Sequence, residues 1–161
     1  MLFEAAVGGG IPIIMPMKMS LAANKFEKIA GILNGTTNYI LTKMDVMGAS
    51  YEDVLKEAQE MGYAESDPTG DVEGYDAQYK LATLATISFN KRIDVNKIYR
   101  EGITKISVQD IEYAKQLGYV IKLVALAQLL ENGEADVRVH PMLLRRSHTL
   151  ANIHGVINAV M

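Results

Sequence analysis

A long apolar segment leads directly into a hairpin signal in the last third of the chain. Residues 120–130 are almost entirely apolar, and Asn132-Gly133 follows them closely. Asn-Gly is favoured in two-residue hairpin turns because both positions need a positive φ. Beyond the turn, Val137 and Val139 alternate with polar residues, as in a strand with one buried face. The sequence therefore predicts an antiparallel hairpin, and with it a sheet that other elements must cover.

Two helices are marked at both of their ends. Segments 50–62 and 107–118 each begin with a serine, carry an aspartate three residues later and end at a glycine. This serine–aspartate spacing is that of a capping box, and glycine readily takes the left-handed conformation that follows a helix. Two further helices are expected over residues 39–47 and 72–89, the second with Asp71 as its N-cap.

Three more segments indicate strands, namely residues 2–8, 27–33 and 155–161. The turn 34–37 joins the second of these to a helix and offers a hydroxyl as its cap. Helices intermixed with an antiparallel hairpin predict an α/β (α+β) fold, a mixed β-sheet with helices packed on one face. The length of 161 residues fits a single domain, 1–161. Because both ends are apolar, we expect a piece of a larger protein.

The composition excludes several classes of function. There is no cysteine, which removes disulfides, thiolate zinc sites, iron–sulfur clusters and cysteine nucleophiles. A pI near 5.6 argues against a nucleic-acid partner, which would need a basic face. The apolar runs are too short to span a bilayer, and the N-terminus lacks a signal-peptide pattern. We therefore expect no membrane association and a cytoplasmic location.

Acidic residues gather in one part of the chain. From Asp45 to Asp76 there are ten acidic residues and one basic residue, Lys56, so this window carries a charge of −9 while the whole chain carries −3. Such a run usually forms a solvated helix face. The alternative is that part of the window receives a cation or an ammonium group.

Residues 58–80 hold the best candidates for chemistry. A helix ends at Gly62, a polar loop follows, and Asp76 and Lys80 then lie four residues apart on one face of the next helix. From spacing alone, an exposed ion pair worth about 0.3–0.5 kcal/mol is the favoured interpretation. The apolar residues of that helix indicate burial, however, and a partly desolvated lysine beside carboxylates can act as a proton donor.

Two other kinds of ligand site fit the sequence less well. A calcium loop needs acidic ligands at alternate positions and a late glutamate, and the acids of this stretch do not keep that spacing. Gly8-Gly9-Gly10 fails as a dinucleotide fingerprint because the next glycine is missing and Pro12 interrupts the helix. A structural turn is the favoured interpretation of the three glycines, although the carbonyls of such a turn can also hold a hard cation.

The stretch 58–80 resembles the homoserine dehydrogenase family. The family pattern is Ala, three residues, Gly, a short gap, Asp-Pro, two residues, Asp, an apolar residue, any residue, Gly, any residue, Asp, three residues and Lys. The matching positions are Ala58, Gly62, Asp67-Pro68, Asp71, Val72, Gly74, Asp76 and Lys80. Segments 4–12 and 34–39 are similar to the same family, so the resemblance covers essentially the whole chain.

The resemblance implies an activity and a set of site residues. Family members reduce aspartate 4-semialdehyde reversibly to L-homoserine with NAD(P)H, on the route to threonine, isoleucine and methionine. The implied proton donor to the carbonyl oxygen is Lys80. The implied substrate contacts are Glu65, Asp76, Asp71 and Thr36, and the implied positions near the cofactor are Gly62 and Glu65. The implied site of a sodium or potassium ion is the loop with the main-chain carbonyls of Glu4, Val7, Gly9 and Ile11.

The resemblance also implies what lies outside this sequence. Family members begin with a Rossmann domain and have a C-terminal segment that returns to it, and neither is matched here. We therefore expect residues 1–161 to form the substrate-binding and dimerisation region of a homodimeric enzyme, inactive by itself. The alternative is a non-catalytic assembly module. The discriminating feature is whether Glu65, Asp76 and Lys80 converge on one cleft.

Overall fold

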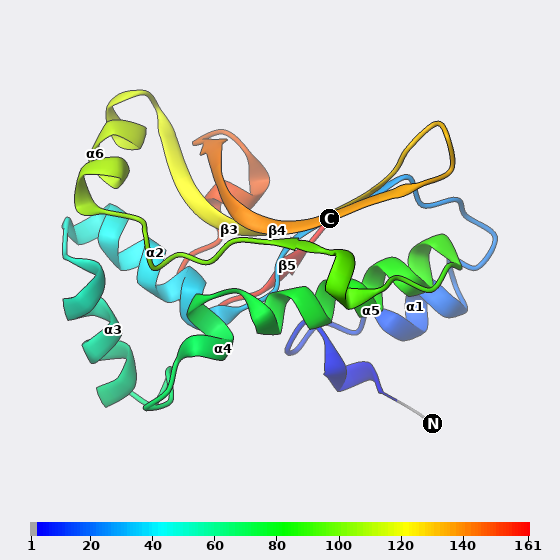
Figure 1. Cartoon of the computed structure of the whole chain (residues 1–161), viewed down its shortest axis with the longest axis horizontal. Helices are drawn as coiled ribbons and strands as arrows, with labels where there is room; N and C mark the ends of the chain where they lie inside the picture. The colour runs from blue at the N-terminus through cyan, green and yellow to red at the C-terminus, as the bar shows by residue number, and fades with distance from the viewer. Residues whose placement is uncertain (1–2) are drawn as a thin grey trace.

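A five-stranded sheet runs through the computed structural model, which describes residues 3–161 (Figure 1). Its strand order is β2-β4-β3-β1-β5, and every neighbouring pair is antiparallel except the parallel pair β2–β4. The strands are β1 (Lys28–Ile32), β2 (Tyr99–Arg100), β3 (Tyr119–Leu129), β4 (Ala135–Arg145) and β5 (Ala159–Val160). The predicted mixed sheet is therefore confirmed.

The hairpin of β3 and β4 forms the centre of the sheet. Its register pairs Tyr119 with Arg145 at the open end and Leu129 with Ala135 beside the turn. Val139 lies opposite Ala125 in this register, and both side chains are buried on the face that the helices cover. The predicted alternation in β4 is thus the reason that one face of the sheet can form a core.

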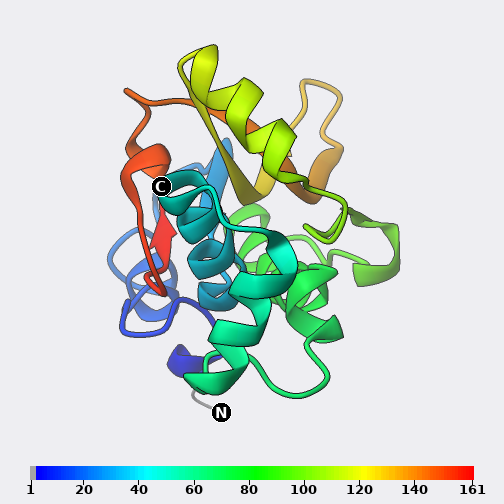
Figure 2. The same ribbon diagram turned by 90° about the vertical axis from the view of Figure 1, so that its left-hand side faces the viewer.

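Six α-helices are present in the described chain. They are α1 (Ile14–Lys18), α2 (Gly35–Met47), α3 (Tyr51–Glu60), α4 (Thr69–Val72), α5 (Tyr75–Phe89) and α6 (Val108–Gln116). Short 3-10 helices are η1 (Glu4–Ala6), η2 (Val95–Lys97) and η3 (Thr149–Asn152). Helices α2, α5 and α6 pack against β3, and α3 lies beside α2 (Figure 2).

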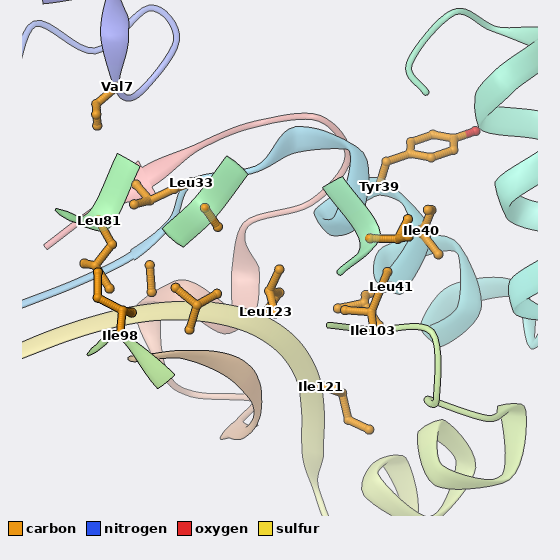
Figure 3. Close-up of a cluster of buried hydrophobic side chains, with 14 of the residues drawn as sticks. Val7, Leu33, Tyr39, Ile40, Leu41, Leu81, Ile98, Ile103, Ile121 and Leu123 are labelled. Carbon is orange, nitrogen blue, oxygen red and sulfur yellow. The ribbon is translucent and has the colours of Figure 1, made fainter. Parts of the chain in front are cut away.

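The main core lies between the sheet and these helices (Figure 3). Leu33, Ile40 and Leu81 are at most 2% exposed and belong to this core, which they enter from the residue after β1, from α2 and from α5. A second, smaller cluster lies on the other face of the sheet, where Leu150 of η3 packs with Val124 and neighbouring strand residues. Helices thus cover one face, as predicted, and a short return segment covers part of the other.

The predicted helix ends are confirmed by their hydrogen bonds. Ser107 and Asp110 form a complete capping box at the start of α6. At the start of α3, the Ser50 hydroxyl accepts from the Asp53 backbone N–H at 3.2 Å. Past the ends of these helices, Gly62 and Gly118 take φ values of +75° and +81°. Local signals alone were sufficient here because every contact falls within one helical turn.

Three local predictions were wrong. Within the described part of segment 2–8, residues 4–6 form the 3-10 helix η1 rather than a strand, because apolarity without alternation does not distinguish the two. Segment 155–161 is mostly irregular, and only its residues 159–160 form a strand. The cap of α2 is the Asn34 side chain, which accepts from the Thr37 backbone N–H, rather than a hydroxyl.

The predicted helix over residues 72–89 is present as α5, which begins three residues later, and the separate short helix α4 precedes it. Gly74 takes a φ of +82° and is the N-cap of α5, so the chain turns sharply between α4 and α5. Asp71 was predicted to be the N-cap but lies inside α4. The division determines how the polar residues of this region meet.

Within residues 3–161, no helix is both long enough and apolar enough to cross a membrane.

Candidate functional site

A polar hollow of about 390 Å³ opens where β1 ends and α2, α4 and α5 begin. It is lined by Asn34, Gly35, Thr36, Gly62, Tyr63, Asp71, Asp76, Lys80 and Val156. Five of these nine residues, namely Thr36, Gly62, Asp71, Asp76 and Lys80, were singled out from the sequence. The hollow therefore brings together residues that are up to 122 positions apart in the chain, from Asn34 to Val156.

Lys80 is held in place at its charged end. Its Nζ donates to Asp76 Oδ2 at 2.6 Å and to the main-chain oxygen of Leu33 at 3.1 Å. The lysine side chain is 27% exposed and the aspartate side chain 35%, so the ion pair is only partly solvated. Because Leu33 directly follows β1, the ammonium is held by the segment between the sheet and α2 as well as by its own helix.

The two acidic side chains come from different helices. Asp71 lies on α4 and Asp76 on α5, and both accept hydrogen bonds from the Asn34 amide, at 2.7 Å and 2.9 Å. In one continuous helix, residues five apart would point about 140° away from each other. The turn at Gly74 removes this separation, so both carboxylates reach the same hollow.

Thr36 and Tyr63 also line the hollow. The Thr36 hydroxyl donates to the main-chain oxygen of Tyr63 at 2.7 Å, which joins α2 to the loop after α3. The Tyr63 ring packs edge-to-face on Tyr39, with 5.1 Å between the ring centroids. The Thr36 oxygen keeps lone pairs that can accept from a ligand in the hollow.

The last segment of the chain closes one side of the hollow. Asn38 Nδ2 donates to the Gly155 carbonyl at 2.8 Å and holds this segment against α2. Gly35 lies beneath it so closely that an added Cβ would stand 2.7 Å from the Val156 carbonyl oxygen. Val156 itself is 43% exposed and adds the apolar part of the lining.

The charges of the hollow favour a ligand that carries an ammonium group. Two carboxylates and one ammonium line it, which leaves a local charge of −1. Asp71 Oδ2 and Asp76 Oδ1 have no hydrogen-bond partner among residues 3–161, so each acid can still accept from a bound ammonium group. Lys80 offers a proton and a positive charge at the same place.

Glu65 and Gly62 differ in their relation to this hollow. Gly62 lines it, whereas the exposed side chain of Glu65 is not part of the lining. The loop that carries Glu65 is attached to α3 through Gln59, whose amide donates to the Glu65 carbonyl at 3.0 Å. Of the three residues expected to converge, Asp76 and Lys80 do so, and a role for Glu65 stays a prediction.

The N-terminal loop lies outside the hollow. The Glu4 carboxylate accepts from the backbone N–H groups of Ile14 and Met15, both at 2.7 Å, so it caps α1. Val7 is buried in the main core, and Gly9 faces Asn158. No group of three or more His, Asp or Glu side chains within residues 3–161 gathers as a metal site. A site of main-chain carbonyls in the loop with Ile11 remains a prediction.

Sequence reasoning did not assign Asn34, Gly35, Tyr63 or Val156 to the site. A signal was present for Asn34, since an asparagine before a helix is a typical cap, but its contacts with the acids span 37 and 42 residues. Nothing in the local sequence reveals contacts of that range.

Comparisons with known proteins point to one family for this chain. The family model described as homoserine dehydrogenase matches residues 12–161. Homoserine dehydrogenase from Synechocystis sp. is 52% identical over 163 residues, which is 99% of this chain and 38% of that protein. The crystal structure of a homoserine dehydrogenase from Thiobacillus denitrificans superposes with a TM-score of 0.95 at 49% identity, covering 98% of this chain and 36% of that one.

A more distant structure is a hyperthermophilic archaeal homoserine dehydrogenase in complex with NADPH. It has a TM-score of 0.80 at 29% identity and covers 99% of this chain and 44% of that one. The present chain spans little more than a third of the length of the curated relatives it matches.

Proposed function

This chain belongs to the homoserine dehydrogenase family, and we propose that it supplies the substrate-binding and catalytic half of an enzyme that interconverts aspartate 4-semialdehyde and L-homoserine with NAD(P)H. The observation that carries the proposal is the Lys80 ammonium, held 2.6 Å from Asp76 in a hollow that it shares with Asp71 and Thr36. The proposed location of the enzyme is the cytoplasm.

The two acids recognise the amino-acid part of the substrate. L-homoserine carries an α-ammonium group, and the free oxygens of Asp71 and Asp76 are acceptors of the right charge for it. Hydrogen bonds between charged groups are stronger than those between neutral groups. The site should therefore prefer an amino-acid aldehyde to an aldehyde that lacks the ammonium group. The Thr36 hydroxyl oxygen is a neutral acceptor in the same hollow.

Lys80 acts on the substrate oxygen. Negative charge develops on the carbonyl oxygen during reduction, and a fixed ammonium group stabilises that charge and then donates its proton. In the opposite direction the neutral amine accepts the proton of the homoserine hydroxyl. Asp76 and the Leu33 carbonyl hold Nζ in place through both steps.

The edge of the hollow suits a nicotinamide cofactor. A Cβ added at Gly62 would meet no atom within 4 Å, so this edge is open to close approach by a planar ring. When bound, NAD(P)H supplies the hydride, while this chain orients the substrate and handles the proton. We assign Gly62 and the exposed Glu65 to this edge.

Replacement of the proton donor tests the proposal. In the complete gene product, Lys80→Met should lower kcat for L-homoserine-dependent reduction of NADP by at least about 100-fold, because the proton transfer loses its donor. Lys105→Met, which changes an exposed lysine outside the hollow, is the matched control and should leave kcat unchanged. A fully active Lys80→Met enzyme would contradict the proposal. An inactive parent enzyme would favour the assembly-module alternative.

We also propose a sodium or potassium ion at the main-chain carbonyls of Glu4, Val7, Gly9 and Ile11. The positive φ values of Gly8 and Gly10, +68° and +79°, support it because they reverse the chain direction within this loop. Exchange of sodium or potassium for tetramethylammonium, which is too large for such a loop, should lower activity. Unchanged activity would oppose the proposal.

A further inference from the structure

The Asn34 side chain forms hydrogen bonds with the first turn of α2, with Asp71 and with Asp76. Asn34 is 5% exposed, and it stands at the end of β1 and the start of α2. Its Oδ1 accepts from the Thr37 backbone N–H at 2.8 Å and from the Thr37 hydroxyl at 2.9 Å. Since these donors fix the oxygen, the Nδ2 group must face the other way, toward Asp71 and Asp76.

The amide nitrogen has two protons and meets two carboxylates. It donates to Asp71 Oδ1 at 2.7 Å and to Asp76 Oδ2 at 2.9 Å. The two acids therefore cannot stand further apart than these two hydrogen bonds allow, although their charges repel. Each acid uses one oxygen for Asn34 and keeps its other oxygen free of partners among residues 3–161.

The same contact controls Lys80 indirectly. Asp76 Oδ2 accepts from both Asn34 and Lys80, so the carboxylate cannot rotate without breaking one of these bonds. Only an amide combines an acceptor for the helix start with two donors for the acids. Serine and aspartate can cap α2 equally well but cannot hold both acids.

We propose that Asn34 is the positioning residue of the site: it sets the separation of Asp71 and Asp76 that receives the substrate α-ammonium, and it holds Asp76 in the orientation that keeps Lys80 in place. Asn34 acts through these three side chains and does not itself react. This role of Asn34 rests on the proposed function. The experiments below distinguish a failure of the role of Asn34 from a failure of the proposed function.

The experiment separates capping from positioning with two cap-competent variants of the complete gene product. Asn34→Ser keeps an N-cap but is too short to reach the acids. Asn34→Asp keeps the cap and the shape but replaces the donor with a third carboxylate. Both should raise KM for L-homoserine by at least about tenfold, with KM for the nucleotide cofactor changed less than about twofold.

The control is Ser107→Ala, which removes the cap of α6, a helix that contributes no residue to the lining of the hollow. It should lower the melting temperature without changing KM for homoserine. If Asn34→Ser folds and keeps the parental KM, Asn34 is only a helix cap and the inference is overturned. If a variant is too unstable to assay, a measurement on the parent protein tests the inference instead.

A second measurement needs no activity. In NMR spectra of the parent protein, both Asn34 side-chain amide protons should exchange slowly with solvent. Asp71→Asn and Asp76→Asn should each speed the exchange of one of the two protons. Fast exchange in the parent would overturn the inference. An enzyme that does not oxidise homoserine but shows slow exchange would overturn the proposed function alone.

Discussion

Lys122 is a charged side chain buried in the sheet, away from the candidate site. It is 2% exposed, and its Nζ donates to Asn38 Oδ1 at 2.9 Å, to Thr42 Oγ1 at 3.1 Å and to the Ile153 carbonyl at 2.6 Å. Burial lowers its pKa from 10.5 to about 8, and the charge of Asp45 opposes this only in part. The residue ties α2, β3 and the last segment of the chain together.

This burial predicts a pH-dependent stability. Between pH 8 and 10.5 the unfolded chain binds more protons at Lys122 than the folded chain does, so the free energy of unfolding rises with pH in this window. In urea titrations, the free energy of unfolding of the parent, measured relative to that of Lys122→Met, should rise by up to about 3 kcal/mol from neutral to alkaline pH. Lys105→Met is the exposed control and should parallel the parent. If the difference in free energy of unfolding between Lys122→Met and the parent does not change with pH, Lys122 has the same protonation in the folded and the unfolded chain, and the prediction is wrong.

The predictability of single residues depends on the range of their contacts. Spacing alone favoured an exposed Asp76–Lys80 pair, and it was the family pattern that placed both residues in a site with Asp71 and Thr36. Asn34 and Lys122 were not identified, because their partners lie between 31 and 84 residues away. An asparagine before a helix and a lysine in an apolar strand occur in many other structural settings, so neither residue type indicates these contacts.

Among the elements, the division between α4 and α5 has the largest effect on the site. A continuous helix over residues 72–89 would satisfy the apolar pattern equally well, and so the pattern predicted one. The deciding fact is the conformation of Gly74, whose φ of +82° ends one helix and begins the next. The capping boxes of α3 and α6 were predictable because their partners lie three residues apart.

Gly74→Ala tests this division. A left-handed conformation costs a non-glycine residue about 1–2 kcal/mol, so the variant should lose about that much stability in urea titrations. It should also raise KM for homoserine, since Asp71 and Asp76 would no longer converge. Gly133→Ala is the matched control, because Gly133 has a φ of +79° in the hairpin turn. That variant should lose similar stability but keep its KM; equal KM values for both variants would oppose the role of Gly74.

For the whole molecule, the fold class could be predicted but the strand order could not. Turn chemistry and alternation indicated a hairpin and helices on one face. The pairing of β5 with β1, or of β2 with β4, joins segments distant in the sequence. Many such pairings would bury similar apolar area, so no local pattern selects one of them.

At the same scale, we expect the complete gene product to be a homodimer. The family resemblance implies it, and exposed apolar side chains such as Leu117 and Leu143, which are 72% and 57% exposed beside an apolar hollow, support association. Sedimentation velocity should give the mass of two chains. A single-chain mass at every concentration tested would refute the expectation.

The close approach of Gly35 to the Val156 carbonyl limits how the hollow can be redesigned. The backbone at position 35 has room only for hydrogen, so enlarging that residue would separate the closing segment from α2. The Val156 side chain, in contrast, is partly exposed and can be exchanged without disturbing the chain beneath it. An engineer seeking to enlarge the hollow should therefore vary residue 156 and leave residue 35 untouched.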